Sequence, residues 1–149
     1  MVTVKVSIVL RPNMTDNYQK ERIKHAAHDL VMKYSIRSVS MDDIAASVGM
    51  SKKTLYQYYK DKDELVKAVI CSVIEGNRCK CDDHVEAADN AVHEIFLAME
   101  MMVEMFKTMN PAILYEMKKY HPDAYQHFQQ HKTQYLHGHI QQNLSLIHI

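Results

Sequence analysis

The stretch IAASVGMSKKTLYQYYKDK, residues 44–62, constrains the fold of this chain more than any other part of its sequence. Small and apolar residues at helical spacing stop at Gly49, which suits the turn after a helix because glycine tolerates positive φ. Ser51 is placed to cap a second short helix. Ala45 lets the two helices approach closely, and Leu55 falls where it can pack back on the first helix. This spacing predicts two short helices joined by a tight turn, as in a helix-turn-helix.

Composition and periodicity predict that helices continue along the rest of the chain. Of the 149 residues, 47% are hydrophobic, but only three are glycine and three proline, too few turn residues for a strand-rich fold. Apolar residues recur at helical spacing over about 16–34, 65–74 and 85–108, and a last helix is predicted from Pro122 to about His139. Further helix starts are predicted at Ser40, Asp61 and Pro111. The predicted fold class is therefore all-α.

Charge is distributed unevenly along the chain, although its formal net charge is zero. Residues 1–67 hold 12 Lys and Arg against 8 Asp and Glu, whereas residues 68–149 hold 6 against 10. The asymmetry indicates that the first part binds a polyanionic partner. The alternative is that the uneven surface charge has no functional meaning. The second short helix carries suitable side chains for DNA, because lysine reaches phosphates or guanine, threonine reaches phosphate or thymine, and glutamine reads adenine. These candidates are Lys52, Lys53, Thr54 and Gln57.

Three tyrosines on or beside the same helix have different expected roles. Tyr59 is expected to bury against the first helix of the chain. Tyr56 is expected to contact a phosphate rather than only to pack. Tyr58 is equally compatible with phosphate contact and with packing.

Residues 17–77 resemble the N-terminal domain of TetR-type transcriptional regulators, whose pattern includes IA..VG.S..TLY.YF..K..L after a Ser or Thr that begins the second helix. The chain departs from this pattern at Lys53, where glycine is common, and at Tyr59, where phenylalanine is usual. The resemblance implies that Ser40, Tyr56 and Lys62 contact the DNA backbone and that other residues of the helix lie at base edges. The predicted DNA-binding set is Ser40, Ser51, Lys52, Lys53, Thr54, Tyr56, Gln57, Tyr58 and Lys62.

The resemblance also implies how the chain is organised. A three-helix DNA-binding domain is expected over 14–76, with its helix-turn-helix motif at about 40–59. The residues themselves, NRCKCDDH, indicate a connection at 77–84. A partial helical domain for effector binding and dimerisation is expected over 77–149, and the chain is expected to be truncated at its C-terminus. Residues 1–13 form an unassigned arm. The implied function is a repressor that binds a double-stranded DNA operator as a homodimer and is released by a small-molecule effector.

Methionine-rich sequence in the second half is compatible with two structures. Methionine adapts to irregular ligands, so these residues are candidates to line a pocket for an apolar ligand. Ordinary core packing is the alternative for each of them. The candidates are Met99, Met101, Met102, Met105 and Met109, together with Phe96 and Tyr115.

Two other kinds of protein remain as alternatives. A metal- or redox-sensing protein is one, because Cys79, Cys81 and His84 lie within six residues and His127 and His131 are four apart. Zinc sites usually show more regular paired spacing, so no metal or other cofactor is predicted. The second alternative is a helical interaction protein with a methionine-rich surface and no DNA binding. An enzyme is not predicted, because the sequence has no glycine-rich phosphate loop, nucleophile elbow or paired catalytic carboxylates.

The sequence also predicts the compartment. Three clustered cysteines (Cys71, Cys79 and Cys81) are too few for a disulfide framework. No apolar run reaches the roughly 18–20 residues that span a bilayer, and the first residues lack the features of a signal peptide. We predict a cytoplasmic protein without a membrane partner.

Overall fold

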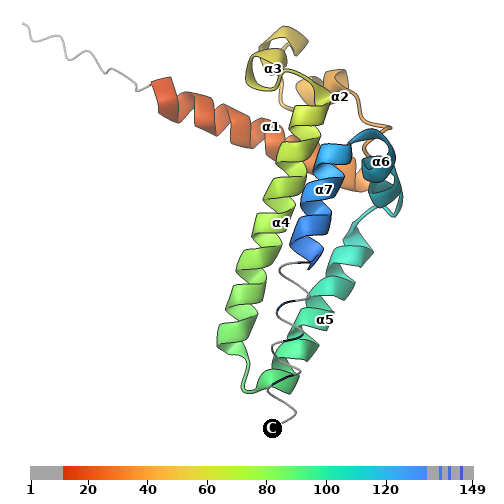
Figure 1. The fold of residues 1–149 in the computed structure, drawn as a ribbon. Helices are drawn as coiled ribbons and strands as arrows, with labels where there is room; N and C mark the ends of the chain where they lie inside the picture. The colour runs from red at the N-terminus through yellow and green to blue at the C-terminus, as the bar shows by residue number, and fades with distance from the viewer. Residues whose placement is uncertain (1–11, 134–137, 139–140, 142–144, 146–149) are drawn as a thin grey trace, which may run out of the picture.

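The computed structural model describes residues 12–133, 138, 141 and 145, and these residues contain no strand, which confirms the all-α prediction (Figure 1). The helices in chain order are α1 (Pro12–Tyr34), α2 (Met41–Ser47), α3 (Lys52–Tyr58), α4 (Lys62–Ala87), α5 (Ala91–Thr108), α6 (Ala112–Tyr120) and α7 (Pro122–His131). Residues 1–11 of the predicted arm lie outside the described residues. Residues 12 and 13 are the first two residues of α1. None of the described helices is long and apolar enough to cross a membrane.

The N-terminal head consists of α1, α2, α3 and the first part of α4, and it supplies most of the apolar core of the described structure. The inner face of α1 contributes Ile23, Ala27 and Val31, which follow one another at one-turn spacing and are almost completely buried. α1 ends where Ser35 adopts a left-handed backbone with φ of 81°. The core is completed from the other elements by Ile36, Val39, Met41, Ile44, Ala45, Leu55, Tyr59, Leu65, Val66, Val69 and Ile70.

α4 is longer than the sequence suggested, and the predicted connection at 77–84 is wrong. The helix continues through Gly76 to Ala87, and α5 begins only at Ala91, behind the cap Asn90. A glycine inside a helix costs roughly 1 kcal/mol relative to alanine, which the flanking turns can offset. The segment that follows contains no proline, so nothing in it forces the helix to stop. One helix therefore runs from the head along the whole C-terminal part (Figure 1).

The C-terminal helices pack beside α4 rather than around a closed core. α7 lies along α4, and α6 packs on α7 and lies close to the end of α1 (Figure 1). Ile113, Met117 and Ala124 are buried where these helices meet. The described part of α7 ends at His131, and the remainder of its predicted span to about residue 139 falls mostly outside the described residues.

α5 leaves one apolar face in solvent. The helix contributes no buried side chain. Its exposed apolar residues recur every three or four positions and are Val92, Phe96, Met99, Val103 and Phe106. The periodicity predicted a helix over about 85–108, which begins too early because α5 starts at Ala91, and the same periodicity does not place this helix in the core.

Candidate nucleic-acid interface

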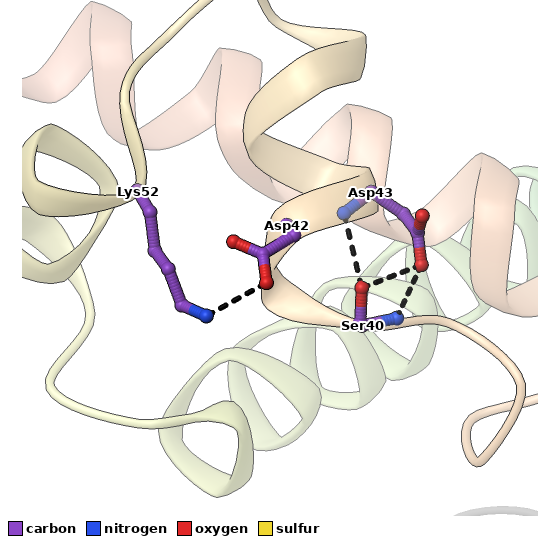
Figure 2. A network of polar contacts seen from close by, with 4 residues as sticks. All are labelled: Ser40, Asp42, Asp43 and Lys52. Atoms are coloured by element: carbon purple, nitrogen blue, oxygen red, sulfur yellow. Dashed lines mark hydrogen bonds and ion pairs between the residues drawn. The ribbon is translucent and has the colours of Figure 1, made fainter.

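The first helix of the predicted motif is fixed by a reciprocal cap. The Ser40 hydroxyl accepts a hydrogen bond from the Asp43 amide at 3.1 Å, and the Asp43 carboxylate accepts from the Ser40 amide at 2.8 Å and from its hydroxyl at 2.6 Å (Figure 2). Hydrogen bonds from the Ser40 hydroxyl and amide hold the pKa of Asp43 below its ordinary value. Two otherwise unpaired helix-terminal groups are thus satisfied, which sets the start of α2.

The turn between the two helices has the geometry that the sequence predicted. Gly49 has φ of 69°, in the left-handed region, and its amide donates to the Ala46 carbonyl at 3.1 Å. The Met50 amide closes the turn on the Ala45 carbonyl at 2.9 Å. Arg22 of α1 donates to the Val48 carbonyl at 3.2 Å. The end of α2 is therefore fastened to α1 as well as to α3.

α3 is anchored on its inner side. Leu55 is completely buried and Tyr59 is 6% exposed. The Tyr59 hydroxyl donates to the Lys20 carbonyl of α1 at 3.4 Å, which confirms that this tyrosine buries against the first helix. Burial also raises the pKa of Tyr59. The inner face of α3 thus has no freedom to rotate away from the core.

The outer side of α3 presents the predicted contact residues to solvent. Lys53, Tyr56 and Gln57 are exposed. Thr54 is half-buried, and its hydroxyl lies 2.8 Å from that of Ser51, whose side chain caps the helix by accepting from the Thr54 amide at 3.1 Å. The structure therefore gives the Ser51 hydroxyl a capping role and pairs the Thr54 hydroxyl with it, in addition to the predicted contacts of both with DNA.

Tyr58 and Lys62 are less accessible than the other predicted residues. Tyr58 is half-buried and packs against the core of the head, in agreement with the packing alternative. Lys62 is the first residue of α4 and is also half-buried, and this burial lowers its pKa, whereas the charges of Glu116 and Asp43 act in the opposite direction. Since Asp43 belongs to the Ser40 cap, Lys62 lies near the start of α2, and the structure brings these two predicted backbone contacts together.

Lys52 differs from its neighbour Lys53 because it has an internal partner. Its ammonium group lies 2.7 Å from the Asp42 carboxylate on α2, and both side chains are exposed (Figure 2). The hydrogen bond with Asp42 raises the pKa of Lys52. This pair was not predicted from the sequence. Two opposite charges at the starts of two packed helices were the available signal.

Glu116 of α6 connects the C-terminal helices to the head. Its carboxylate accepts a hydrogen bond from the Ser35 hydroxyl at 3.2 Å and from the Arg37 amide at 2.8 Å. The Asn110 amide also donates to the Met32 carbonyl at the end of α1, at 3.2 Å. The sequence analysis missed Glu116, because its partners lie 81 and 79 residues away along the chain. These contacts fasten α6 to the connection that leads into α2.

A cavity of about 780 Å³ lies among α4, α5, α6, α7 and the end of α1. Five of the seven predicted pocket residues line it: Met101, Met102, Met105, Met109 and Tyr115. Phe96 and Met99 do not, and both are more than half exposed on the outer face of α5. The volume falls within the roughly 300–1,000 Å³ that is typical of small-molecule sites.

The structure gives the metal-sensing alternative no support in the part that it describes. Among the described residues, no group of three or more His, Cys, Asp or Glu side chains is arranged to hold a metal ion. Cys79 is exposed. The side chains of Cys81 and His84 are not among those that the structure describes. His127 is exposed, whereas His131 forms part of the cavity wall.

Comparison with known proteins gives matches that centre on the head. A sequence profile of the family described as bacterial regulatory proteins, tetR family, matches residues 23–69. An uncharacterized HTH-type transcriptional regulator of Bacillus subtilis (strain 168), YvaF, is 36% identical over 89 residues, which are 59% of this chain and 47% of that protein. An HTH-type transcriptional regulator of Staphylococcus aureus (strain USA300) is 37% identical over 51 residues, 34% of this chain and 28% of that protein. The match thus spans about half the length of the Bacillus subtilis relative and less than a third of the Staphylococcus aureus one.

One solved structure shares the fold over most of the chain. The crystal structure of superantigen pfit superposes with a TM-score of 0.63 and covers 88% of this chain and 67% of that one. The two sequences are 16% identical, so the likeness concerns the helical arrangement alone.

Proposed function

We propose that this chain, whose residues 23–69 match the tetR family of bacterial regulatory proteins, is a member of that family and a sequence-specific DNA-binding transcriptional regulator. One observation carries this proposal. Leu55 and Tyr59 hold the inner face of α3 against the core, while Lys53, Tyr56 and Gln57 point out of the protein on the same short helix. A helix presented in this way fits the major groove, where its first residues reach base edges.

The predicted DNA-binding residues divide into two groups by what they reach. The start and outer face of α3 supply contacts at or near base edges, from Lys52, Lys53, Thr54 and Gln57. The helix starts and the tyrosines supply backbone contacts, which position the protein without reading sequence. These backbone contacts are Ser40, Ser51, Tyr56, Tyr58 and Lys62. The amide groups at the start of α3 favour a phosphate further.

The proposed mode of action is repression by a homodimer. Two copies would place two α3 helices in successive major grooves, and the bound pair would occlude a promoter. A small molecule in the cavity would change the spacing of the two helices and release the DNA. The cavity is lined by α4 and α6, and Glu116 joins α6 to the connection that leads into α2, which supports such a coupling. In this proposal the protein acts in the cytoplasm, by binding rather than by catalysis.

The proposed division of labour follows the predicted domains. Residues 14–76 would bind DNA, and residues 77–149 would hold the effector. α4 crosses this boundary without a break, so the two parts share one helix.

Fluorescence anisotropy tests the proposal directly. The purified chain is titrated into labelled duplexes from the region upstream of its own gene and into random duplexes, over a salt series. We expect affinity that falls steeply with salt and that is higher for one upstream sequence than for random DNA. Binding without preference would contradict a sequence-specific regulator in this form of the chain. Absence of binding at low salt would contradict DNA binding altogether and favour the interaction-protein alternative.

A further inference from the structure

We propose that the cavity binds an anionic amphiphile, a ligand with a flexible apolar chain and one negatively charged head group, such as a medium- or long-chain carboxylate. This inference deepens the proposed function by naming the chemical class of its effector. It rests on two independent properties of the cavity, the nature of its walls and the sign of the charges around them.

The walls suit a flexible hydrocarbon chain. Methionines come from four different parts of the fold, and their unbranched side chains adapt to an irregular or mobile apolar surface. Two amide side chains of the lining are already paired within the described structure, because Asn77 donates to the Met105 sulfur at 3.4 Å and Gln129 donates to the Tyr125 hydroxyl at 2.6 Å. The apolar lining residues are Met32, Ile70, Val73, Ile74, Met101, Met102, Met105, Phe106, Met109, Ile113, Leu114, Met117 and Phe128.

The charged lining residues are mostly basic. Lys80 of α4, Lys118 of α6 and Lys132 after α7 all line the cavity and are exposed. Lysine stems can cover apolar surface while their ammonium groups stay in water, so these three place positive charge at the mouth and methylene groups along the wall. The positive charge comes from three separate elements around the cavity, which are α4, α6 and the segment after α7.

The remaining titratable side chains of the lining do not cancel this positive charge. The carboxylate of Glu104 accepts a hydrogen bond from Lys107 at 2.6 Å, and the positive charge of Lys107 offsets its negative charge. His131 lies in the wall, where burial, followed by the charge of Arg78, lowers its pKa, and the charge of Glu75 acts in the opposite direction. His28, which also lines the cavity, lies 3.0 Å from the Asp29 carboxylate. An anionic head at the mouth would therefore meet a surplus of lysine.

This arrangement predicts an order of affinity for ligands that share one chain and differ in the head group. A carboxylate gains from the lysines, an alcohol gains nothing from their charge, and a quaternary ammonium is repelled. Exposed ion pairs are individually weak, so two or three of them should give the carboxylate roughly a fivefold to tenfold advantage over the alcohol at low salt. That advantage should shrink in 0.5 M salt, because exposed charges are screened.

The experiment uses the full chain without DNA and three probes: decanoate, decanol and decyltrimethylammonium. Each is titrated by displacement of an environment-sensitive fluorescent dye from the cavity, at low and at high salt. We expect decanoate to bind most tightly and the ammonium compound most weakly. Equal binding of decanoate and decanol, or no binding of either, would overturn the proposal. Because DNA is absent, these outcomes are independent of whether the chain binds an operator.

Charge-neutral variants test the assigned residues. The triple variant Lys80→Gln, Lys118→Gln, Lys132→Gln should bind decanoate no better than decanol while its affinity for decanol stays the same. Lys119→Gln is the matched control, because Lys119 is the next residue of α6 and does not line the cavity. All these lysines are exposed, and circular dichroism verifies that the variants fold. Equal loss of decanoate binding in the control and the triple variant would refute the assignment.

Discussion

The ammonium group of Lys52 lies 2.7 Å from the Asp42 carboxylate, so the first residue of α3 is already paired inside the motif. Lys53, the next residue, has no ion pair in the described part of the structure. The two adjacent lysines therefore differ in what binding a phosphate or a guanine would require of them. Lys52 must break its ion pair with Asp42 before it binds a phosphate or a guanine, whereas Lys53 has no such pair to break.

Asp42→Asn should strengthen DNA binding. The substitution frees Lys52 and removes a negative charge near the phosphates, so affinity at low salt should rise roughly threefold to tenfold. The loss of an acid from the first turn should lower the free energy of unfolding by about 0.5 kcal/mol. Anisotropy with the preferred duplex measures the first effect and urea unfolding the second.

The control for this substitution is Glu75→Gln, which breaks a similarly exposed pair with Arg78, 2.6 Å long, outside the motif. Its DNA affinity should be unchanged. A weaker Asp42→Asn complex would instead mean that Asp42 holds Lys52 in its binding geometry.

Lys53→Ala and Tyr56→Ala should each weaken DNA binding without unfolding the protein. Both side chains are exposed on α3, so their removal leaves the core intact. A phosphate or base contact contributes about 1 kcal/mol, which corresponds to roughly a fivefold loss of affinity. Lys107→Ala on α5 is the control for loss of a lysine. Unchanged affinity in both α3 variants, with native circular dichroism, would refute the placement of α3 in the groove.

Substitutions at Gly49 should destabilise the head in the order Asn, Ala, Val, with valine the worst. A Cβ at this position would meet no other atom within 4 Å, so space is not the limit. The cost comes from the backbone, since φ is 69° and L-residues lose roughly 1–2 kcal/mol in this region, with asparagine losing least. Urea unfolding of the three variants measures the order. Equal stability in all of them would show that the turn relaxes to another conformation.

Asp43→Asn should make the head less stable at neutral pH, with a difference that disappears in acid. Hydrogen bonds from the Ser40 hydroxyl and amide lower the pKa of Asp43 in the folded state. Its contribution is therefore complete above its ordinary pKa of 3.8 and is lost as the pH falls through the lower folded-state value. Urea unfolding of both proteins over the acidic range measures the convergence.

Ser40→Ala is the companion variant for this test, because it removes the hydroxyl that acts on the Asp43 pKa. The pH dependence attributed to Asp43 should be smaller in that background. A difference between wild type and Asp43→Asn that stays constant with pH would contradict the cap as its source.

Local signals in the sequence were sufficient for the head. Ser40, Ser51 and Asp61 were recognisable as caps because each acts on residues three positions further along. Gly49 was recognisable because few other residues tolerate its backbone conformation. In each case the partner is near in sequence, so the spacing itself carried the information.

Other features depend on partners that spacing cannot show. Glu116 reaches Ser35 and Arg37 only because α6 folds back beside α1. The continuation of α4 through Gly76 depended on flanking turns that outweigh one unfavourable residue. Phe96 and Met99 were expected at a pocket, but the apolar pattern of α5 does not say which face meets α4. Tertiary packing decided the position of Glu116 and the outward orientation of Phe96 and Met99.

The unbroken α4 has a geometric consequence. A helix of 26 residues is about 39 Å long, so a tilt of about 5° at one end displaces the other by roughly 3 Å. That distance is comparable to the rise of about 3.4 Å between successive base pairs of DNA. A tilt of α4 that leaves all hydrogen bonds within the helix intact would thus displace the head by about the rise of one base pair.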